Sequence, residues 1–179
     1  MKAVIIAAGM GNRLWQTTNK TPKTLLPFGQ GTILSTIMDN LSLAGIESFV
    51  IVLGYKAELI ESYLQEQNQL GYRITLLYNN EWQRGNGISV LKAAQALDGR
   101  DFLLSMADHL VSVPALQAVV GQADGQNLLL VDRRLRQIFD PDDATKVLVN
   151  GRFIKNIGKE IEEYNGVDCG IFRLTGRFF

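Results

Sequence analysis

Several residue types that build common functional sites are almost missing from this sequence of 179 residues. Cysteine occurs once, at Cys169, which excludes an internal disulfide framework and a cysteine-rich zinc site and favours a reducing compartment. Histidine also occurs once, at His109, so a metal centre with several histidine ligands is impossible. Neither positive nor negative charge is in excess, because 18 basic side chains balance 18 acidic ones. A nucleic-acid binder that relies on bulk positive charge is therefore disfavoured.

Long apolar runs are missing as well. No run approaches the ~20 residues that cross a bilayer. Only six apolar residues separate Lys2 from Gly9, which is too few for a signal peptide. We therefore expect a cytoplasmic protein with no membrane contact and no nucleic-acid partner. The composition that remains, 46% apolar and 20% charged, is that of a globular protein, and the length predicts a single domain over residues 1–179.

Short apolar runs alternate with helical segments over the first 126 residues. A run typical of a strand buried on both faces occupies residues 3–8, and further strands are expected at residues 49–53, 73–78 and 102–106. Helical patterns follow them, beginning at a capping Thr32, at Tyr55 (to Gln69), at about Ile88 (to Leu97) and at Ser112. This alternation predicts an α/β protein with a Rossmann-like, doubly wound sheet built by right-handed crossovers.

The pattern changes after residue 126. Four further strands are expected, at residues 127–132, 145–149, 153–157 and 167–174. Asn150-Gly151 between two of them is a strong signal for a hairpin turn. The predicted sheet is therefore mixed, though mostly parallel.

Residues 9–31 contain repeated glycine and proline and should be mostly loop. So long a loop in a small domain is usually functional.

Ligands of open α/β sheets bind beyond the carboxyl ends of the strands, and a glycine-rich segment follows the first strand there. Gly9 and Gly11 allow the backbone to approach phosphate oxygens closely, and Arg13 can bind a phosphate with two hydrogen bonds. The alternative is a tight turn with a solvated arginine. Leu14 replaces the third glycine of a dinucleotide-binding fingerprint, and no P-loop motif is present.

Two charged residues complete a possible phosphate site. Lys23, after a proline in the same loop, could place a point charge on phosphates. Asp108 follows the fourth strand and could hold Mg²⁺, which prefers a few carboxylates together with substrate phosphates. Taken alone, each has an ordinary explanation, a surface lysine and a turn or capping aspartate. His109 has no partner ligand, so we expect it to support the site rather than to bind metal.

Three further segments are candidates of lower specificity. Gly85 and Asn86 precede a helix. The backbone there could approach a nucleoside closely, and the side-chain amide of Asn86 could hydrogen-bond to its base or sugar. The alternative there is a flexible turn with a helix cap. Lys159 and Asp168 lie on the later strands, and each by itself would pass as a surface charge.

Taken together, these residues resemble the nucleotidyltransferase superfamily that makes activated sugars and alcohols. The resemblance rests on the order of Ala7-Ala8-Gly9-Met10-Gly11-Asn12-Arg13, Pro22-Lys23, Asp108 and the later Gly170-Ile171-Phe172. The segments 81–89, 106–109 and 167–170 are most similar to inositol-1-phosphate cytidylyltransferases. The resemblance covers nearly the whole chain and implies the nucleotide-diphospho-sugar transferase fold.

The resemblance implies a reaction and a role for each residue. A phosphate monoester oxygen would attack the α-phosphorus of CTP and release pyrophosphate, and Mg²⁺ on Asp108 would bridge the nucleotide phosphates. The triphosphate would be bound by Ala8, Gly9, Gly11 and Asn12, and the departing pyrophosphate by Arg13. Lys23 would contact the α-phosphoryl group, and Gly85 and Asn86 the cytidine. Lys159 would bind the phosphate of the acceptor, and Asp168 a hydroxyl of the acceptor. Small molecules, CTP and a phosphorylated sugar or polyol, are the partners implied.

The sequence departs from the family in one respect. The family supplies a second magnesium carboxylate after the segment that matches residues 167–174, but this chain stops at Phe179. We therefore expect the C-terminal part of the domain to be missing, together with the membrane-embedded transferase domain of bifunctional members. Two alternatives stay open, a nucleotide-binding or regulatory module without turnover, and a nucleotidyltransferase that uses another nucleotide and sugar phosphate.

Overall fold

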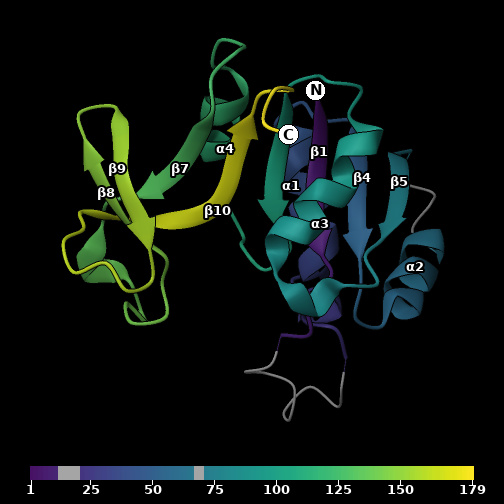
Figure 1. Cartoon of the computed structure of the whole chain (residues 1–179). Helices are drawn as coiled ribbons and strands as arrows, with labels where there is room; N and C mark the ends of the chain where they lie inside the picture. Colours follow the sequence, from purple (N-terminus) through teal and green to yellow (C-terminus); the bar gives the residue numbers. More distant parts are fainter. Residues whose placement is uncertain (12–20, 67–70) are drawn as a thin grey trace.

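The computed structural model describes residues 1–11, 21–66 and 71–179. An eight-stranded sheet runs through these residues (Figure 1). Its core is four parallel strands, which lie in the order β5 (Arg73–Tyr78), β4 (Ser48–Leu53), β1 (Lys2–Ala7) and β6 (Phe102–Met106). The predicted α/β fold with a mostly parallel core is confirmed.

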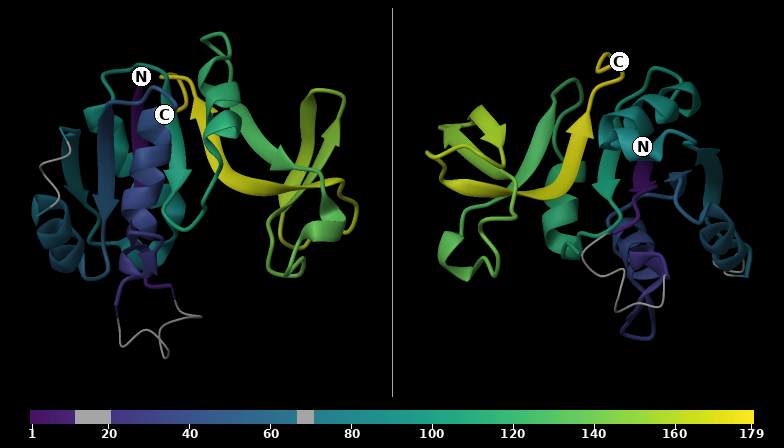
Figure 2. Two further views of the ribbon diagram at one scale, coloured as in Figure 1. Left: turned by 180° about the vertical axis from the view of Figure 1, so that it is seen from behind. Right: turned by 60° about the horizontal axis from the view of Figure 1, so that its bottom comes forward.

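Helices cover both faces of this core, as Figures 1 and 2 show from opposite sides. The side chains of β1 alternate between two clusters, with Ala3, Ile5 and Ala7 on one face and Val4 and Ile6 on the other. The first face packs against α1 (Ile33–Leu43), α2 (Ala57–Glu66) and α4 (Val113–Val120), and the second against α3 (Asn86–Ala93). Because β1 is buried on both faces, its continuous apolar run follows directly from its central place.

Local sequence signals account for several element ends. Thr32 caps α1 as predicted, and its side chain and that of Ser35 each accept a hydrogen bond from the other's backbone N–H. α3 begins at Asn86, two residues before the expected start. The end predicted for the second helix, at Gln69, lies outside the described residues. Single turns of 3-10 helix occur at η1 (Lys23–Leu25), η3 (Trp82–Arg84), η4 (Ala94–Ala96) and η5 (Leu135–Gln137). Residues 9–31 also contribute strand β2 (Pro27–Phe28), which pairs with β3 (Gly31–Thr32).

The last four strands form an arm beside the core. They are β7 (Leu128–Asp132), β8 (Lys146–Asn150), β9 (Phe153–Gly158) and β10 (Gly166–Leu174). β10 is long and curved and joins the arm to the core (Figure 1): its start pairs with β8, its end pairs with β6, and β7 pairs with both parts. The register of β10 shifts between Asp168 and Phe172, around Gly170, whose φ of +70° favours glycine.

In the described ranges, no helix combines the length and the apolar character that a membrane crossing requires.

Close packing at the ends of β1 and β4 depends on Gly54. The N–H of Tyr55 donates to the carbonyl of Ala8 at 2.9 Å, which holds the two strand ends together. A Cβ at Gly54 would lie 2.6 Å from the Cβ of Trp82 and 2.7 Å from the carbonyl oxygen of Ala8. Gly54 therefore sets the position of the backbone that leads into Gly9.

We expect Gly54→Ala to lower the free energy of unfolding by about 1–3 kcal/mol, because backbone must shift to admit the methyl group. Urea denaturation followed by circular dichroism measures this loss. Gly87→Ala is the control, since nothing lies within 4 Å of a Cβ there and the residue is helical. An unchanged midpoint for the Gly54 variant would contradict the packing argument.

Candidate active site at the carboxyl ends of β1 and β6

A cavity of about 120 Å³ lies where β1 and β6 end. The strands are parallel neighbours, with Ile6 level with Met106, and the N–H of Ala107 donates to the carbonyl of Ile6. From β1 the chain builds the sheet first toward β4 and β5, and later returns to the other side of β1 with β6. Such a switch point is where open α/β sheets bind ligands. The cavity is smaller than the ~300 Å³ of common ligand sites, so it has room for only part of a ligand of that size.

Five of the residues selected from the sequence border this one cavity. They are Gly9, Gly11, Lys23, Asn86 and Asp108. They come from four separate segments of the chain, so their convergence is a property of the fold. Ala8 is buried beside the cavity, Gly85 is exposed next to Asn86, and Asn12 and Arg13 lie outside the described residues.

The glycine-rich segment leaves room for a ligand. A Cβ at Gly9 would meet nothing within 4 Å, so this side of the backbone is open. Gly11 has a φ of +66°, and a Cβ there would lie 3.2 Å from the Cβ of Lys23. Glycine at position 11 thus relieves backbone strain and also allows the lysine stem to pass close by. Both properties fit a backbone that receives phosphate oxygens.

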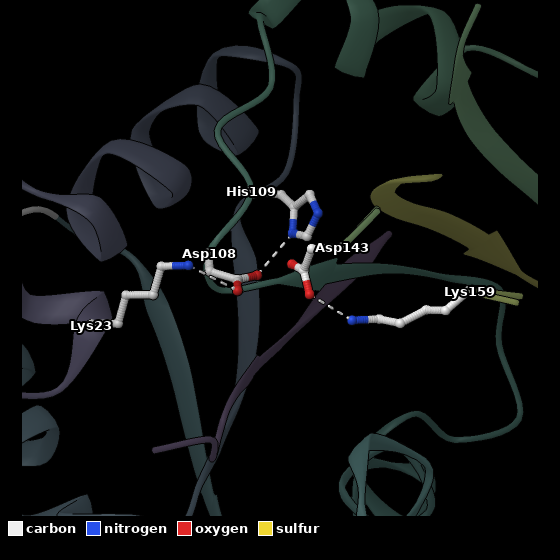
Figure 3. A network of polar contacts seen from close by, with 5 residues as sticks. All are labelled: Lys23, Asp108, His109, Asp143 and Lys159. Carbon is white, nitrogen blue, oxygen red and sulfur yellow. Dashed lines mark hydrogen bonds and ion pairs between the residues drawn. The ribbon is translucent and has the colours of Figure 1, made fainter. Parts of the chain in front are cut away.

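Lys23, Asp108 and His109 form a chain of charged hydrogen bonds (Figure 3). The Lys23 Nζ donates to Oδ2 of Asp108 at 3.2 Å, and the Nδ1 of His109 donates to Oδ1 at 2.8 Å. The hydrogen bond from His109, helped by the charge of Lys23, holds the pKa of Asp108 well below its usual range. The same hydrogen bond raises the pKa of His109. Asp108 is therefore an anion at neutral pH.

His109 also connects the core to the arm. A Cβ at Gly170 would lie 2.6 Å from the His109 ring, so the imidazole packs directly on the bend of β10. The charge of Asp168 contributes to the raised pKa of His109, after the larger effect of Asp108. The histidine is thus placed to support Asp108, in the role that its lack of partner ligands predicted.

Asp168 lies within β10, whereas Lys159 lies one residue past the end of β9, so the expectation that both residues are on strands is confirmed for Asp168 only. Lys146 of β8 is opposite both Val167 of β10 and Gly158 of β9. One step beyond this row, Asp168 donates its N–H to the carbonyl of Thr145 at 2.9 Å, and Lys159 follows Gly158. The two residues therefore lie on opposite sides of β8, near the end where that strand begins. Burial raises the pKa of Asp168.

Asp143 is a member of this group that the sequence reasoning missed. Its Oδ1 accepts from the Lys159 Nζ at 2.9 Å, and Figure 3 shows the pair with its labelled neighbours. Asp143 lies two residues before Thr145, so its position depends on how β8 begins. The run Asp140-Pro141-Asp142-Asp143 offers three similar carboxylates. No sequence signal separates Asp143 from the other two.

Asp108 has the chemistry that Mg²⁺ requires, and among the residues that the structure describes it is the only carboxylate bordering the cavity. Within the described residues, no group of three or more histidine, cysteine, aspartate or glutamate side chains could hold a metal ion. An ion on Asp108 would thus take most of its oxygen ligands from substrate phosphates and water, which is the usual arrangement for Mg²⁺. The described residues fit such a site, and Asp108 is the protein ligand that they offer.

Residues 2–131 match the sequence model of a family described as "Nucleotidyl transferase". The chain is 34% identical over 178 residues to a bifunctional IPC transferase and DIPP synthase from Aquifex aeolicus. It is 33% identical over 179 residues to a protein of the same description from Archaeoglobus fulgidus. These alignments cover 99% and 100% of this chain but only 40% and 34% of the relatives. The chain thus spans well under half the length of these relatives.

Comparison with solved structures also finds nucleotide transferases. The inositol-1-phosphate CTP transferase from T. maritima is 33% identical and superposes with a TM-score of 0.86, covering 97% of this chain and 70% of that one. A glucose-1-phosphate thymidylyltransferase homologue from Bacillus anthracis has a TM-score of 0.82 at 20% identity, covering 99% and 72% of the two chains. The second similarity concerns the fold alone. The resemblance inferred from the ordered motifs, to this superfamily and to inositol-1-phosphate cytidylyltransferases within it, is confirmed.

Proposed function

We propose that this chain, which belongs to the nucleotidyl transferase family, transfers a cytidylyl group from CTP to a phosphorylated sugar or polyol, with inositol-1-phosphate as the favoured acceptor. The choice of CTP and of inositol-1-phosphate is supported by the name of the T. maritima protein, which is 33% identical to this chain where the two align. The products would be a CDP-alcohol and pyrophosphate.

One observation carries the proposal: Gly9, Gly11, Lys23, Asn86 and Asp108 border one cavity at the switch point of the sheet. An open glycine backbone, a lysine and a carboxylate are the groups that a triphosphate with its metal ion requires. The arm adds Lys159 and Asp168, a cation and a carboxylate that suit a phosphorylated polyol. His109, which hydrogen-bonds Asp108 and packs on Gly170, links the two sets.

The proposed chemistry is a single displacement at phosphorus. A phosphate oxygen of the acceptor forms a bond to the α-phosphorus of CTP, and the bond from that phosphorus to the bridging oxygen of pyrophosphate breaks. No proton has to be removed from the acceptor, because its phosphate is already an anion at neutral pH. The protein therefore needs to position two polyanions and to neutralise their charge.

Each residue has a role in that positioning. The backbone at Gly9 and Gly11 receives phosphate oxygens, and Asn86 contacts the cytidine. Lys23, which neutralises Asp108 in the ligand-free protein, stabilises the charge on the α-phosphoryl group. Mg²⁺ held by Asp108 would supply further charge neutralisation between the phosphates. Arg13, which lies outside the described residues, is assigned to the departing pyrophosphate.

We expect Lys159→Ala to raise the KM for the acceptor by about 10-fold or more, because a charged hydrogen bond to its phosphate is lost. The kcat and the affinity for CTP should change far less, since Lys159 is assigned to the acceptor alone. Steady-state kinetics with inositol-1-phosphate and calorimetry with CTP measure the two effects. Lys155→Ala removes an exposed lysine of β9, the strand that precedes Lys159, and is the control. Equal losses of acceptor and CTP affinity would contradict the assignment.

A screen for pyrophosphate release tests the reaction itself. The purified chain is mixed with Mg²⁺, each of the four nucleoside triphosphates, and a panel of sugar and polyol phosphates. We expect the highest rate with CTP and inositol-1-phosphate. Release only with another pair would reassign the substrates, whereas CTP binding without release from any pair would favour a binding module. Neither release nor nucleotide binding would refute the proposal.

A further inference from the structure

Thr24 carries a buried hydroxyl without a hydrogen-bond partner. The residue is 7% exposed, and in the described part of the chain only two buried side-chain polar atoms are unpartnered, Oγ1 of Thr24 and Nε of Arg173. The Arg173 guanidinium uses its other nitrogens to bind Val120, Gln122 and Asp124. Thr24 differs because its only polar group is left unpaired. A hydroxyl can donate one hydrogen bond and accept two.

An unpaired buried hydroxyl is unfavourable for the ligand-free protein. Burial removes the water that would hydrogen-bond to the group, and nothing in the protein replaces that water. Valine has nearly the same shape and would avoid this loss. Native structures hold few such groups, and each one calls for an explanation. A role that becomes favourable when a ligand binds is one explanation.

The position of Thr24 indicates which ligand its hydroxyl would bind. It follows Lys23 in η1 and borders the same cavity as Gly9, Gly11, Asn86 and Asp108. The oxygen is shielded in the ligand-free protein, but a rotation of about 120° about χ1 exchanges it with another substituent of the same Cβ. No hydrogen bond opposes this rotation, because the hydroxyl has none to break. Thr24 can thus redirect its hydroxyl toward an occupant of the cavity without breaking a hydrogen bond.

We propose that Thr24 is a nucleotide-binding residue, whose hydroxyl donates to an acceptor oxygen of the nucleotide in the cavity at the ends of β1 and β6. This inference rests on the proposed function, since it requires a nucleotide there. The acceptor is an oxygen of the phosphates or of the ribose. Thr24 therefore lowers the stability of the empty protein and raises its affinity for the nucleotide.

Three variants of the whole chain test this proposal. Thr24→Val removes the hydroxyl and keeps the shape, while Thr24→Ser keeps the hydroxyl. Thr36→Val is the matched control, because the Thr36 hydroxyl lies in α1 and donates to the carbonyl of Thr32 at 2.9 Å. Urea unfolding without ligand gives the stability, and calorimetry with CTP and Mg²⁺ gives the affinity.

We expect Thr24→Val to raise the urea midpoint by about 0.5 M and to weaken CTP binding about 10-fold. Thr24→Ser should bind CTP within about threefold of the wild type, and Thr36→Val should show neither the higher midpoint nor the weaker binding. Opposite changes in stability and affinity are the signature of the proposal, since a residue of purely structural importance would not produce them.

The two proposals fail in different ways. If the wild type binds no nucleoside triphosphate, the proposed function is wrong and the role of Thr24 falls with it. If the wild type binds CTP and Thr24→Val binds it equally well, only the role of Thr24 is wrong. A lower midpoint for Thr24→Val would also overturn the inference, because the hydroxyl would then have a partner in the empty protein.

Further titrations identify the acceptor oxygen. CMP and pyrophosphate are titrated separately into the wild type and Thr24→Val. If Thr24→Val binds pyrophosphate more weakly than the wild type does but binds CMP equally well, the hydroxyl donates to the outer phosphates. A loss for CMP but not for pyrophosphate assigns it to the α-phosphate or the ribose. An equal affinity of the wild type and Thr24→Val for CMP, pyrophosphate and CTP would refute the proposal.

Discussion

Replacing Lys23 with alanine is expected to lower kcat by about 10²- to 10³-fold, the effect of removing one preorganised donor from a transition state. Charge on the α-phosphoryl oxygens redistributes as the new bond forms, and the Lys23 ammonium, already directed at Asp108 from 3.2 Å, lies at the cavity where this happens. The Kd for CTP should rise much less, because the backbone at Gly9 and Gly11 still receives the triphosphate. Rapid-quench kinetics and calorimetry measure the two quantities.

Lys92→Ala is the matched control for Lys23→Ala. Lys92 is an exposed lysine near the end of α3, so its loss changes the net charge by the same amount without touching the cavity. We expect wild-type kinetics for this variant. Should Lys23→Ala reduce kcat and CTP affinity by the same factor, the lysine would contribute only to ground-state binding.

Asp108→Asn should remove the effect of Mg²⁺ on nucleotide binding. For the wild type we expect Mg²⁺ to strengthen CTP binding, because the carboxylate and the phosphates share the ion. The amide keeps the shape of the side chain but lacks the negative charge, so CTP affinity should no longer depend on Mg²⁺, and kcat should fall at least 10²-fold. Calorimetric titrations of CTP with Mg²⁺ and with EDTA measure the change.

The control for Asp108→Asn is Asp98→Asn, at the opposite end of β6. Asp98 pairs with Lys2 on the surface, where ion pairs contribute little, and asparagine tolerates its φ of +53°. Its Mg²⁺ dependence should match that of the wild type. Were CTP binding by Asp108→Asn still strengthened by Mg²⁺, Asp108 would not be the metal ligand.

The parallel core could be predicted because its signals are local. The apolar run that forms β1 is buried on both faces, which only a central strand requires, and Thr32 lies at the N-cap that its side chain favours. The short β2–β3 pair was not predicted, since two-residue strands leave no periodic pattern. The start of α3 at Asn86 was also missed, because Gly85 and Gly87 flank it and glycine is a poor guide to helix ends.

The site was predictable to the extent that its residues follow strands. Gly9 and Asp108 follow β1 and β6, so parallel pairing alone brings them together. The positions of Lys159 and Asp168 relative to each other depend on the registers of β8, β9 and β10, which no short motif specifies. Asp143 and Thr24 were missed for a related reason. An ion pair and an unpaired hydroxyl are properties of three-dimensional surroundings, and neither residue type is unusual in its sequence context.

The course of β10 has a consequence for how the protein is made. The edge of β6 that faces away from β1 is completed by residues 171–174, near the end of the chain, although β6 itself ends at Met106. A nascent chain that has left the ribosome only as far as β9 therefore presents β6 as an open, apolar edge, which is prone to pair with other chains. The core and the arm should become stable together, once β10 has been synthesised.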